Sequence, residues 1–142
     1  MHPKKTVKKS PTTDSPNPKD LLGLKKPPLG LVPPSAIILE SMAMKDGAIK
    51  YNSYNWRLKK VIATIYLDAC QRHLLSWQDG EEHAADSGVH HLGHARACLG
   101  ILIDAMTTGN LIDDRPTPGS AAKLIASLTV TNKTVPKKRR KR

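Results

Sequence analysis

Hydrophobic residues recur at spacings of three and four along three stretches of the chain, and this spacing predicts three amphipathic helices. We expect them at about residues 36–50, from about 56 or 58 to 77, and at about 87–108, with Gly109 as the natural stop of the third. A shorter helix is expected at about 120–128. The apolar stripe of the third helix consists of Leu92, Ala95, Leu99, Leu102 and Met106.

The segments between these helices carry turn-forming residues and predict no strand. In residues 19–35, Leu alternates with Gly and Pro, which favours an extended strap laid over a helical surface and disfavours a helix. Ser35 and Ser87 are placed to cap the helices that follow them. Residues 50–60 contain Asn and Ser between aromatic rings, so we expect a tight polar turn there.

These elements predict an all-α protein, a small bundle of three to four helices. Aromatic residues make up 4% of the chain and Phe is absent, so the core must be aliphatic, and a small core of that kind favours completion by homo-oligomerisation. We expect one domain at residues 20–119, a short C-terminal helix at 120–130, and disordered basic tails at 1–19 and 131–142.

The net charge of +11 is concentrated in the tails. Residues 20–119 carry ten Lys and Arg against eleven Asp and Glu, so the predicted folded part is close to neutral. The last six residues, KKRRKR, suit weak contact with a nucleic acid, or serve only as a solvated tail that aids solubility. An alternative function is therefore a helical accessory protein that binds nucleic acid through its basic ends.

Cysteine usage and hydropathy predict a cytoplasmic location. Cys70 and Cys98 show no metal-binding spacing and suit reduced core thiols of an intracellular protein. No apolar run approaches the roughly 20 residues that span a bilayer, and the lysine-rich start lacks the apolar segment of a signal peptide.

An acidic loop directly before the third helix is the first candidate for chemistry. His91 and His94 lie three residues apart in the first turns of that helix, so they share a face. Carboxylates and imidazoles together suit a divalent metal held against a phosphate, although a solvated loop beside two surface histidines has the same pattern. The loop carboxylates are Asp79, Glu81, Glu82 and Asp86.

Two further groups suit a polar ligand. Glu40 lies inside the first helix among apolar residues, where a carboxylate is costly unless it is paired, binds a metal or points to water. A second group offers cations for phosphates and flat rings and an amide for a base, and would equally suit a plain turn with a Trp anchor. It contains Lys50, Tyr51, Asn55, Trp56 and Arg57, with His73 and Trp77 one helical turn apart farther along.

In order along the chain, VPPSAIILE, GAIKYNSYNWR, RHLLSWQDGEE, DSGVHHLGHA and NLIDDRP resemble the dATP/dGTP diphosphohydrolase-type phage proteins, a branch of the MazG-like all-α nucleoside triphosphate pyrophosphatase superfamily. The resemblance covers about residues 22–119. It implies a homo-oligomer, dimeric or tetrameric, that cleaves dGTP or dATP between the α- and β-phosphates with Mg²⁺ or Mn²⁺. Such an enzyme would serve the nucleotide pool of a phage or bacterium, in the cytoplasm of the bacterial host.

The resemblance also assigns site residues. Glu81, His91 and His94 carry over from the motif as metal ligands, and Glu40 and Asp86 stand beside them on chemical grounds. The superfamily's paired ExxE and ExxD motifs are not both present, because Ala43 follows Glu40 and His91-x-x-His94 stands where a carboxylate pair is expected.

The remaining roles follow from that reaction. Glu81 or Asp86 would accept the proton of an attacking water. Lys50 and Arg57 would hold phosphate charge, and Tyr51, Asn55 and Trp56 would frame the sugar or base, with His73 and Trp77 facing the same cleft. No serine or cysteine stands in a nucleophile arrangement.

Overall fold

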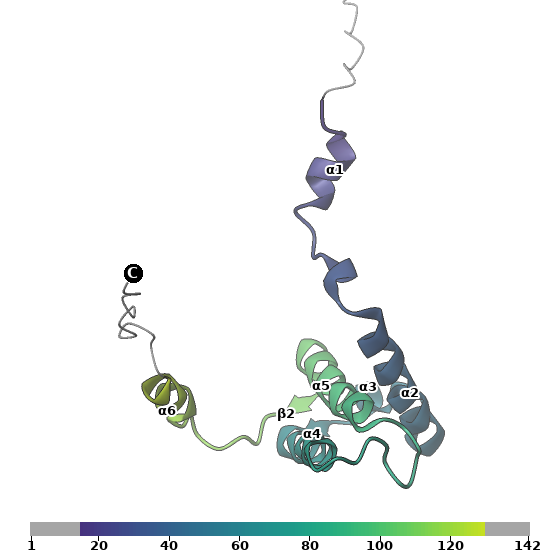
Figure 1. Cartoon of the computed structure of the whole chain (residues 1–142), viewed down its shortest axis with the longest axis vertical. Coiled ribbons are helices and arrows are strands. Elements are labelled where there is room, and N and C mark those ends of the chain that lie inside the picture. Colours follow the sequence, from purple (N-terminus) through teal and green to yellow (C-terminus); the bar gives the residue numbers. More distant parts are fainter. Residues whose placement is uncertain (1–14, 130–142) are drawn as a thin grey trace, which may run out of the picture.

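The computed structural model describes residues 15–129, and most of both predicted tails, including KKRRKR, lies outside the described residues. The described part is mainly helical, which confirms the all-α class (Figure 1). In chain order the elements are α1 (Pro18–Gly23), the short 3₁₀ helix η1 (Leu29–Leu31), α2 (Pro34–Tyr51), α3 (Asn55–Leu58), β1 (Val61–Ile62), α4 (Ala63–Gln78), α5 (His91–Thr107), β2 (Leu111–Ile112) and α6 (Ala121–Leu128).

Three helices form the bundle, with α5 packed against both α2 and α4. The chain that enters α4 and the chain that leaves α5 are joined by a two-residue parallel pairing, Val61 with Leu111 and Ile62 with Ile112. This pairing corrects the prediction of one helix from residue 56 to 77. The β-branched residues Val61 and Ile62 suit extended backbone, so the chain breaks between α3 and α4.

Small residues let α2 and α5 approach closely. Gly93 on α5 lies so near Leu39 on α2 that an added Cβ would stand 2.5 Å from the Leu39 carbonyl oxygen. A Cβ at Gly100 would meet Oε1 of Glu40 at 2.6 Å. Ala97, between the two glycines, is buried. The helix-helix contact therefore depends on residues without bulky side chains.

The core of the described chain is correspondingly small. Its buried hydrophobic residues are mostly alanines, and Val61 is the largest side chain that is fully buried. Larger apolar residues of the predicted stripe are partly exposed, among them Leu99 at 45% and Met106 at 62%. The periodicity correctly identified helices, but not which apolar residues the single chain buries.

Two predicted helix caps are wrong. Helix α2 begins at Pro34, two residues before the first position that a cap at Ser35 allows, and proline is pre-organised for the first turn of a helix. At α5 the cap is His90, whose Nδ1 accepts a hydrogen bond from the Leu92 backbone N–H at 3.1 Å. Ser87 instead bonds to His94.

The flanking segments do not cover the bundle. Helix α1, capped by Asn17 in a stretch expected to be extended, projects away from it (Figure 1), and every residue from 15 to 35 is exposed. Helix α6 forms where expected, yet all of its residues are exposed and it does not pack back. Across residues 15–129, none of the helices combines the length and the apolarity that crossing a lipid bilayer would need.

Candidate functional site

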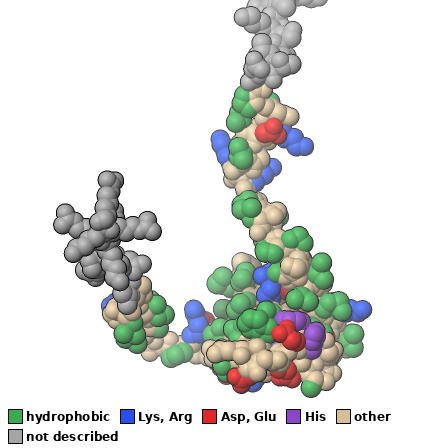
Figure 2. Space-filling view, in the orientation of Figure 1, with side chains coloured by type: hydrophobic (Ala, Val, Ile, Leu, Met, Phe, Trp, Pro, Cys, Tyr) green, Lys and Arg blue, Asp and Glu red, His purple; other side chains and the backbone are tan. Residues whose placement is uncertain are grey.

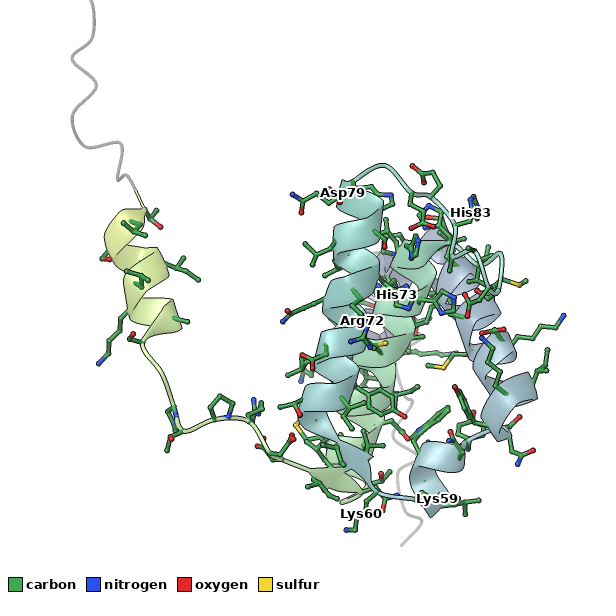
Figure 3. All side chains as sticks on the ribbon, turned by 90° about the horizontal axis from the view of Figure 1, so that it is seen from below. Lys59, Lys60, Arg72, His73, Asp79 and His83 are labelled. Carbon is green, nitrogen blue, oxygen red and sulfur yellow. The ribbon has the colours of Figure 1, made fainter. Side chains whose placement is uncertain are left out.

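A cavity of about 270 Å³ lies between α2, α4 and α5, with the α3 region at one end. Figure 2 shows histidine and acidic side chains gathered on one face of the bundle, and in Figure 3 His73 projects from α4 toward its neighbouring helices. The lining combines apolar residues, aromatic rings and charged groups: Ala43, Met44, Asp46, Gly47, Lys50, Tyr51, Asn55, Trp56, Tyr66, Ala69, His73, Asp86, His94, Ala97, Cys98 and Ile101.

Two carboxylates at the cavity share one cation. Lys50 Nζ lies 2.8 Å from Asp46 Oδ2 on the same helix and 3.3 Å from Asp86 Oδ2 in the loop before α5. Hydrogen bonds to Asp46 and Asp86 raise the pKa of Lys50, and the bond from Lys50 lowers the pKa of Asp86. The charge expected to bind phosphate is therefore neutralised here by carboxylates. Sequence reasoning missed Asp46, although its spacing of four from Lys50 was a signal.

Three imidazoles pack together beside this ion pair. His73 Nδ1 lies 2.9 Å from His91 Nδ1, and the His73 ring stacks on His94 with centroids 4.5 Å apart and planes at 9°. The Ser87 hydroxyl holds His94 Nε2 at 2.8 Å. Burial is the main cause that lowers the pKa of both His73 and His94, so both rings favour the neutral form with a free lone pair.

His91 carries an unsatisfied polar atom. Its side chain is buried, with 5% of the residue exposed, and its Nε2 has no hydrogen-bond partner. Glu81 Oε2 lies 3.2 Å from this Nε2, within ion-pair distance but not in hydrogen-bonding geometry. An unpaired buried nitrogen is costly, so this one is a candidate for contact with something further.

The five predicted metal ligands do not meet at one point. Asp86 and His94 line the cavity, whereas Glu40 is paired with Arg96 Nη2 at 2.9 Å, and Glu81 and His91 lie behind the lining. Within residues 15–129, no group of three or more His, Cys, Asp or Glu side chains is arranged to hold a metal ion. The ligand assignments remain predictions.

Of the predicted substrate-binding residues, the cavity gathers Lys50, Tyr51, Asn55, Trp56 and His73. Arg57 and Trp77 are not in its lining, and Trp77 is 42% exposed.

Asp104 on α5, which sequence reasoning missed, holds the α3 segment. Its Oδ2 accepts from Trp56 Nε1 at 2.7 Å, and its two oxygens accept from Arg57 Nε and Nη2 at 2.8 and 2.9 Å. The ion pair of Arg57 with Asp104 therefore joins the α3 segment to α5. The hydrogen bond from Trp56 to Asp104 fixes the Trp56 ring in the cavity wall.

Replacing Asp104 with asparagine should destabilise the fold and weaken its acid dependence. Hydrogen bonds from Arg57, and then from Trp56, lower the Asp104 pKa from 3.8 to about 2. Because the folded-state pKa lies below the unfolded one, the stabilisation is complete above about pH 4 and is lost as pH falls through about 2. Urea unfolding from pH 7 to pH 2 should show a lower midpoint for Asp104→Asn at neutral pH and a shallower fall in acid.

Asp68→Asn, at an exposed position of α4, is the matched control and should follow the unchanged protein. An Asp104→Asn profile that coincides with this control would contradict the role of the Asp104 contacts.

The cavity offers suitable groups for a divalent cation in two respects. Asp46 and Asp86 already hold one cation between them, the Lys50 ammonium. The rings of His73 and His94, whose pKa values are lowered mainly by burial, line the same cavity. Oxygen donors and neutral imidazole nitrogens are both ligand types that Mn²⁺ accepts, and Mg²⁺ prefers the oxygens.

Comparison with known proteins shows which protein family the chain matches. The family model described as "dATP/dGTP diphosphohydrolase, N-terminal" matches residues 16–115, a range that contains every residue lining the cavity. A "dATP/dGTP diphosphohydrolase" of Salmonella phage PMBT28 is 30% identical over 90 residues, which cover 63% of this chain and 30% of the relative. The chain thus matches less than a third of the length of that relative. No solved structure matches.

Proposed function

The chain belongs to the family of dATP/dGTP diphosphohydrolase N-terminal regions, and from this membership we propose that it hydrolyses a purine deoxynucleoside triphosphate, dGTP or dATP, to the monophosphate and pyrophosphate. It would be a nucleoside triphosphate pyrophosphohydrolase of phage or bacterial nucleotide metabolism. The observation that carries the proposal is the cavity, which brings aromatic rings, an amide, a lysine and carboxylates together within the matched range.

The cavity suits the nucleoside half of such a substrate. Its volume of about 270 Å³ is near the lower end of small-molecule pockets, about 300 Å³. Tyr51, Trp56 and Tyr66 offer flat faces for a base, and Asn55 offers a donor and an acceptor for its edge. The triphosphate would then lie toward Lys50 and the histidines.

Lys50 can serve the phosphates by exchanging partners. Its ammonium is held by Asp46 and Asp86. As a triphosphate enters, Lys50 can transfer its hydrogen bonds to phosphate oxygens. Asp46 and Asp86 are then free to hold divalent cations, with His94 beside them on the cavity wall. Mg²⁺ or Mn²⁺ bound there would neutralise phosphate charge and lower the pKa of a bound water.

The reaction needs only water as the nucleophile. A bond forms between the water oxygen and one phosphorus, the bridging bond between the α- and β-phosphates breaks, and pyrophosphate leaves. Asp86, which lines the cavity, would accept the proton of that water, and Glu81 is the second candidate. Burial is the main cause that raises the pKa of Cys98, a cavity residue, to about 11, so this sulfur stays protonated and is a poor nucleophile.

A nucleotide panel tests the proposal. The purified chain, given Mg²⁺ or Mn²⁺ and each of the four common deoxynucleoside triphosphates, should release pyrophosphate and the monophosphate, with dGTP or dATP turned over fastest. Chromatography of the nucleotides and a pyrophosphate assay identify the products. Release of orthophosphate alone, or no turnover of any nucleotide, would overturn it.

We also propose that the active form is a homo-oligomer. The large aliphatic side chains left exposed on the bundle helices, such as Ile38 at 60% and Ile103 at 59%, support burial against a second copy. Light scattering coupled to gel filtration should give a mass of two or four chains, and a mass of one chain would contradict the proposal.

A further inference from the structure

Helix α6 (Ala121–Leu128) leaves an apolar face in contact with solvent. Every residue of the helix is exposed, Ile125 at 68%, and Figures 1 and 3 both show the helix well apart from the bundle. An isolated helix of 8 residues is marginal in water, so this face needs a surface to pack on. Its apolar residues recur at helical spacing: Ala121, Leu124, Ile125 and Leu128.

A groove on the bundle offers an apolar surface of the matching kind. It lies between α4 and α5 and has a volume of about 160 Å³. Two of its α5 residues, Ile103 and Met106, are more than half exposed, and with Leu99 they form a stripe at spacings of four and three. The groove is apolar apart from one cation, since it is lined by Ala63, Leu67, Leu102, Ile103, Met106, Leu111 and Arg115.

The two apolar faces have the same length. The ends of the α5 stripe, Leu99 and Met106, are seven residues apart, and so are the ends of the α6 face, which makes each about 10 Å long. We propose that α6 of one copy of the chain lies in the groove between α4 and α5 of a second copy, which returns its own α6 in exchange. The inference rests on the proposed function in that it gives the proposed homo-oligomer its interface.

The segment between β2 and α6 directs the helix away from the groove of its own chain. Asp114 Oδ1 accepts a hydrogen bond from the Thr64 backbone N–H at 2.9 Å, which holds the start of the segment against α4. Pro116 and Pro118 follow, and each proline fixes its own φ and biases the residue before it toward extended backbone. Residues 115–118 therefore favour a straight course, and a return to the same groove is disfavoured.

The same segment is long enough to reach a neighbouring copy. The five residues from 116 to 120 span at most about 16–18 Å when extended. The axes of packed helices are separated by only about 8–10 Å, so α6 can cross to a bundle that lies beside its own. A reciprocal exchange about a two-fold axis covers both helices and both grooves, and it leaves no open end at which further copies would add.

Two other occupants compete for these surfaces. The first is α6 of the same chain, turned back at Gly119. The second is an anionic lipid surface, because an amphipathic helix that carries Lys123 and precedes the KKRRKR tail has the composition of a membrane-surface helix. A lipid surface would leave the groove between α4 and α5 uncovered, whereas the exchange covers both apolar faces at once.

Cross-linking between two different chains tests the exchange. One full-length chain carries Ile103→Cys in the groove, the other carries Leu124→Cys on α6, and a size tag on one of them tells the two apart. After mixing and equilibration, a short bis-maleimide should join the two different chains. Ala126→Cys, on the opposite face of α6, is the matched control and should link far less. The unchanged chain gives the background from Cys70 and Cys98.

A pair of charge variants measures the contribution of the α6 face. Ile125→Glu places a carboxylate on the apolar face, and Ala126→Glu places the same charge on the opposite face. Light scattering coupled to gel filtration over a dilution series should show that Ile125→Glu raises the dissociation concentration at least roughly 10-fold, since a buried isoleucine contributes at least that factor. Ala126→Glu should match the unchanged chain. Both positions are exposed, and circular dichroism confirms that each variant is folded.

Three results would overturn the inference. One is a cross-link that forms only within a chain carrying both cysteines, which would place α6 in its own groove. Another is equal behaviour of the two glutamate variants. The third is binding of the unchanged chain, but not of Ile125→Glu, to phosphatidylglycerol vesicles with no difference in mass between them.

Failure of this inference differs from failure of the proposed function. If Ile125→Glu keeps a mass of two or four chains and no cross-link forms, the chain associates through another surface and this inference alone fails. If the unchanged chain has the mass of one chain, the proposed homo-oligomer fails with it. If the cross-link forms as described and no nucleotide is hydrolysed, the exchange stands and the proposed activity fails.

Discussion

Replacing Gly93 with alanine should lower the free energy of unfolding by about 1–3 kcal/mol or more, because the new methyl group overpacks the contact between α2 and α5. Its Cβ would stand 2.5 Å from the Leu39 carbonyl oxygen and 2.9 Å from the carbonyl carbon. Both atoms belong to the backbone of α2, so no side chain can move aside and the helices themselves must separate. Urea unfolding of the variant and the unchanged chain measures the difference.

Gly47→Ala is the matched control and should have the opposite sign. Gly47 also lies inside a helix, α2, but nothing stands within 4 Å of an added Cβ. Alanine there gains helix propensity, worth up to about 1 kcal/mol. If both variants shift the unfolding midpoint in the same direction, the close approach of α2 and α5 at Gly93 is not as described. Gly100→Ala should fall between them, because its methyl group meets the movable end of the Glu40 side chain.

The sequence predicted the helices of the bundle because their signals are local. Apolar spacing along each helix and Gly109 after α5 are both readable within a few residues. The break before α4 could not be predicted in the same way. It depends on Val61 pairing with Leu111, fifty residues away, and no local pattern announces that partner.

The candidate site was predictable in part for the same reason. Lys50, Tyr51, Asn55 and Trp56 are close in sequence, so one helix end and one turn bring them to the cavity together. Apart from the local pair of Asp46 and Lys50, the pairing of carboxylates with cations at the site was not predictable, because the partners come from distant segments.

Glu40 illustrates the difference between a signal that is local in the sequence and a contact that depends on a distant segment. It was expected among the metal ligands because a carboxylate on an apolar helix needs a partner, and in the structure that partner is Arg96, fifty-six positions along the chain. Asp104 reaches Arg57 over forty-seven positions. Sequence indicates that a buried charge must be satisfied, but not by which group.

Asp86→Asn should reduce the rate of pyrophosphate release from the preferred nucleotide by about 100-fold or more, the range expected when a general base is lost. Asparagine keeps the size of the side chain but cannot take up the proton of the attacking water, and it binds a divalent cation more weakly. Asp46→Asn should act in the same direction with a smaller effect, because Asp46 would share a cation but accept no proton. Steady-state assays at saturating metal measure all three proteins, and Asp68→Asn on the outer face of α4 should keep full activity.

Lys50→Met distinguishes this role from a merely structural one. If Asp86 served only to hold Lys50, with which it pairs at 3.3 Å, either substitution would cost the same activity and combining them would add nothing. If Asp86 holds a cation and accepts a proton while Lys50 holds phosphate, the double variant should be slower than either single one. A double variant no slower than Lys50→Met would mean that the two side chains act as one unit, and would contradict the separate roles assigned to them here.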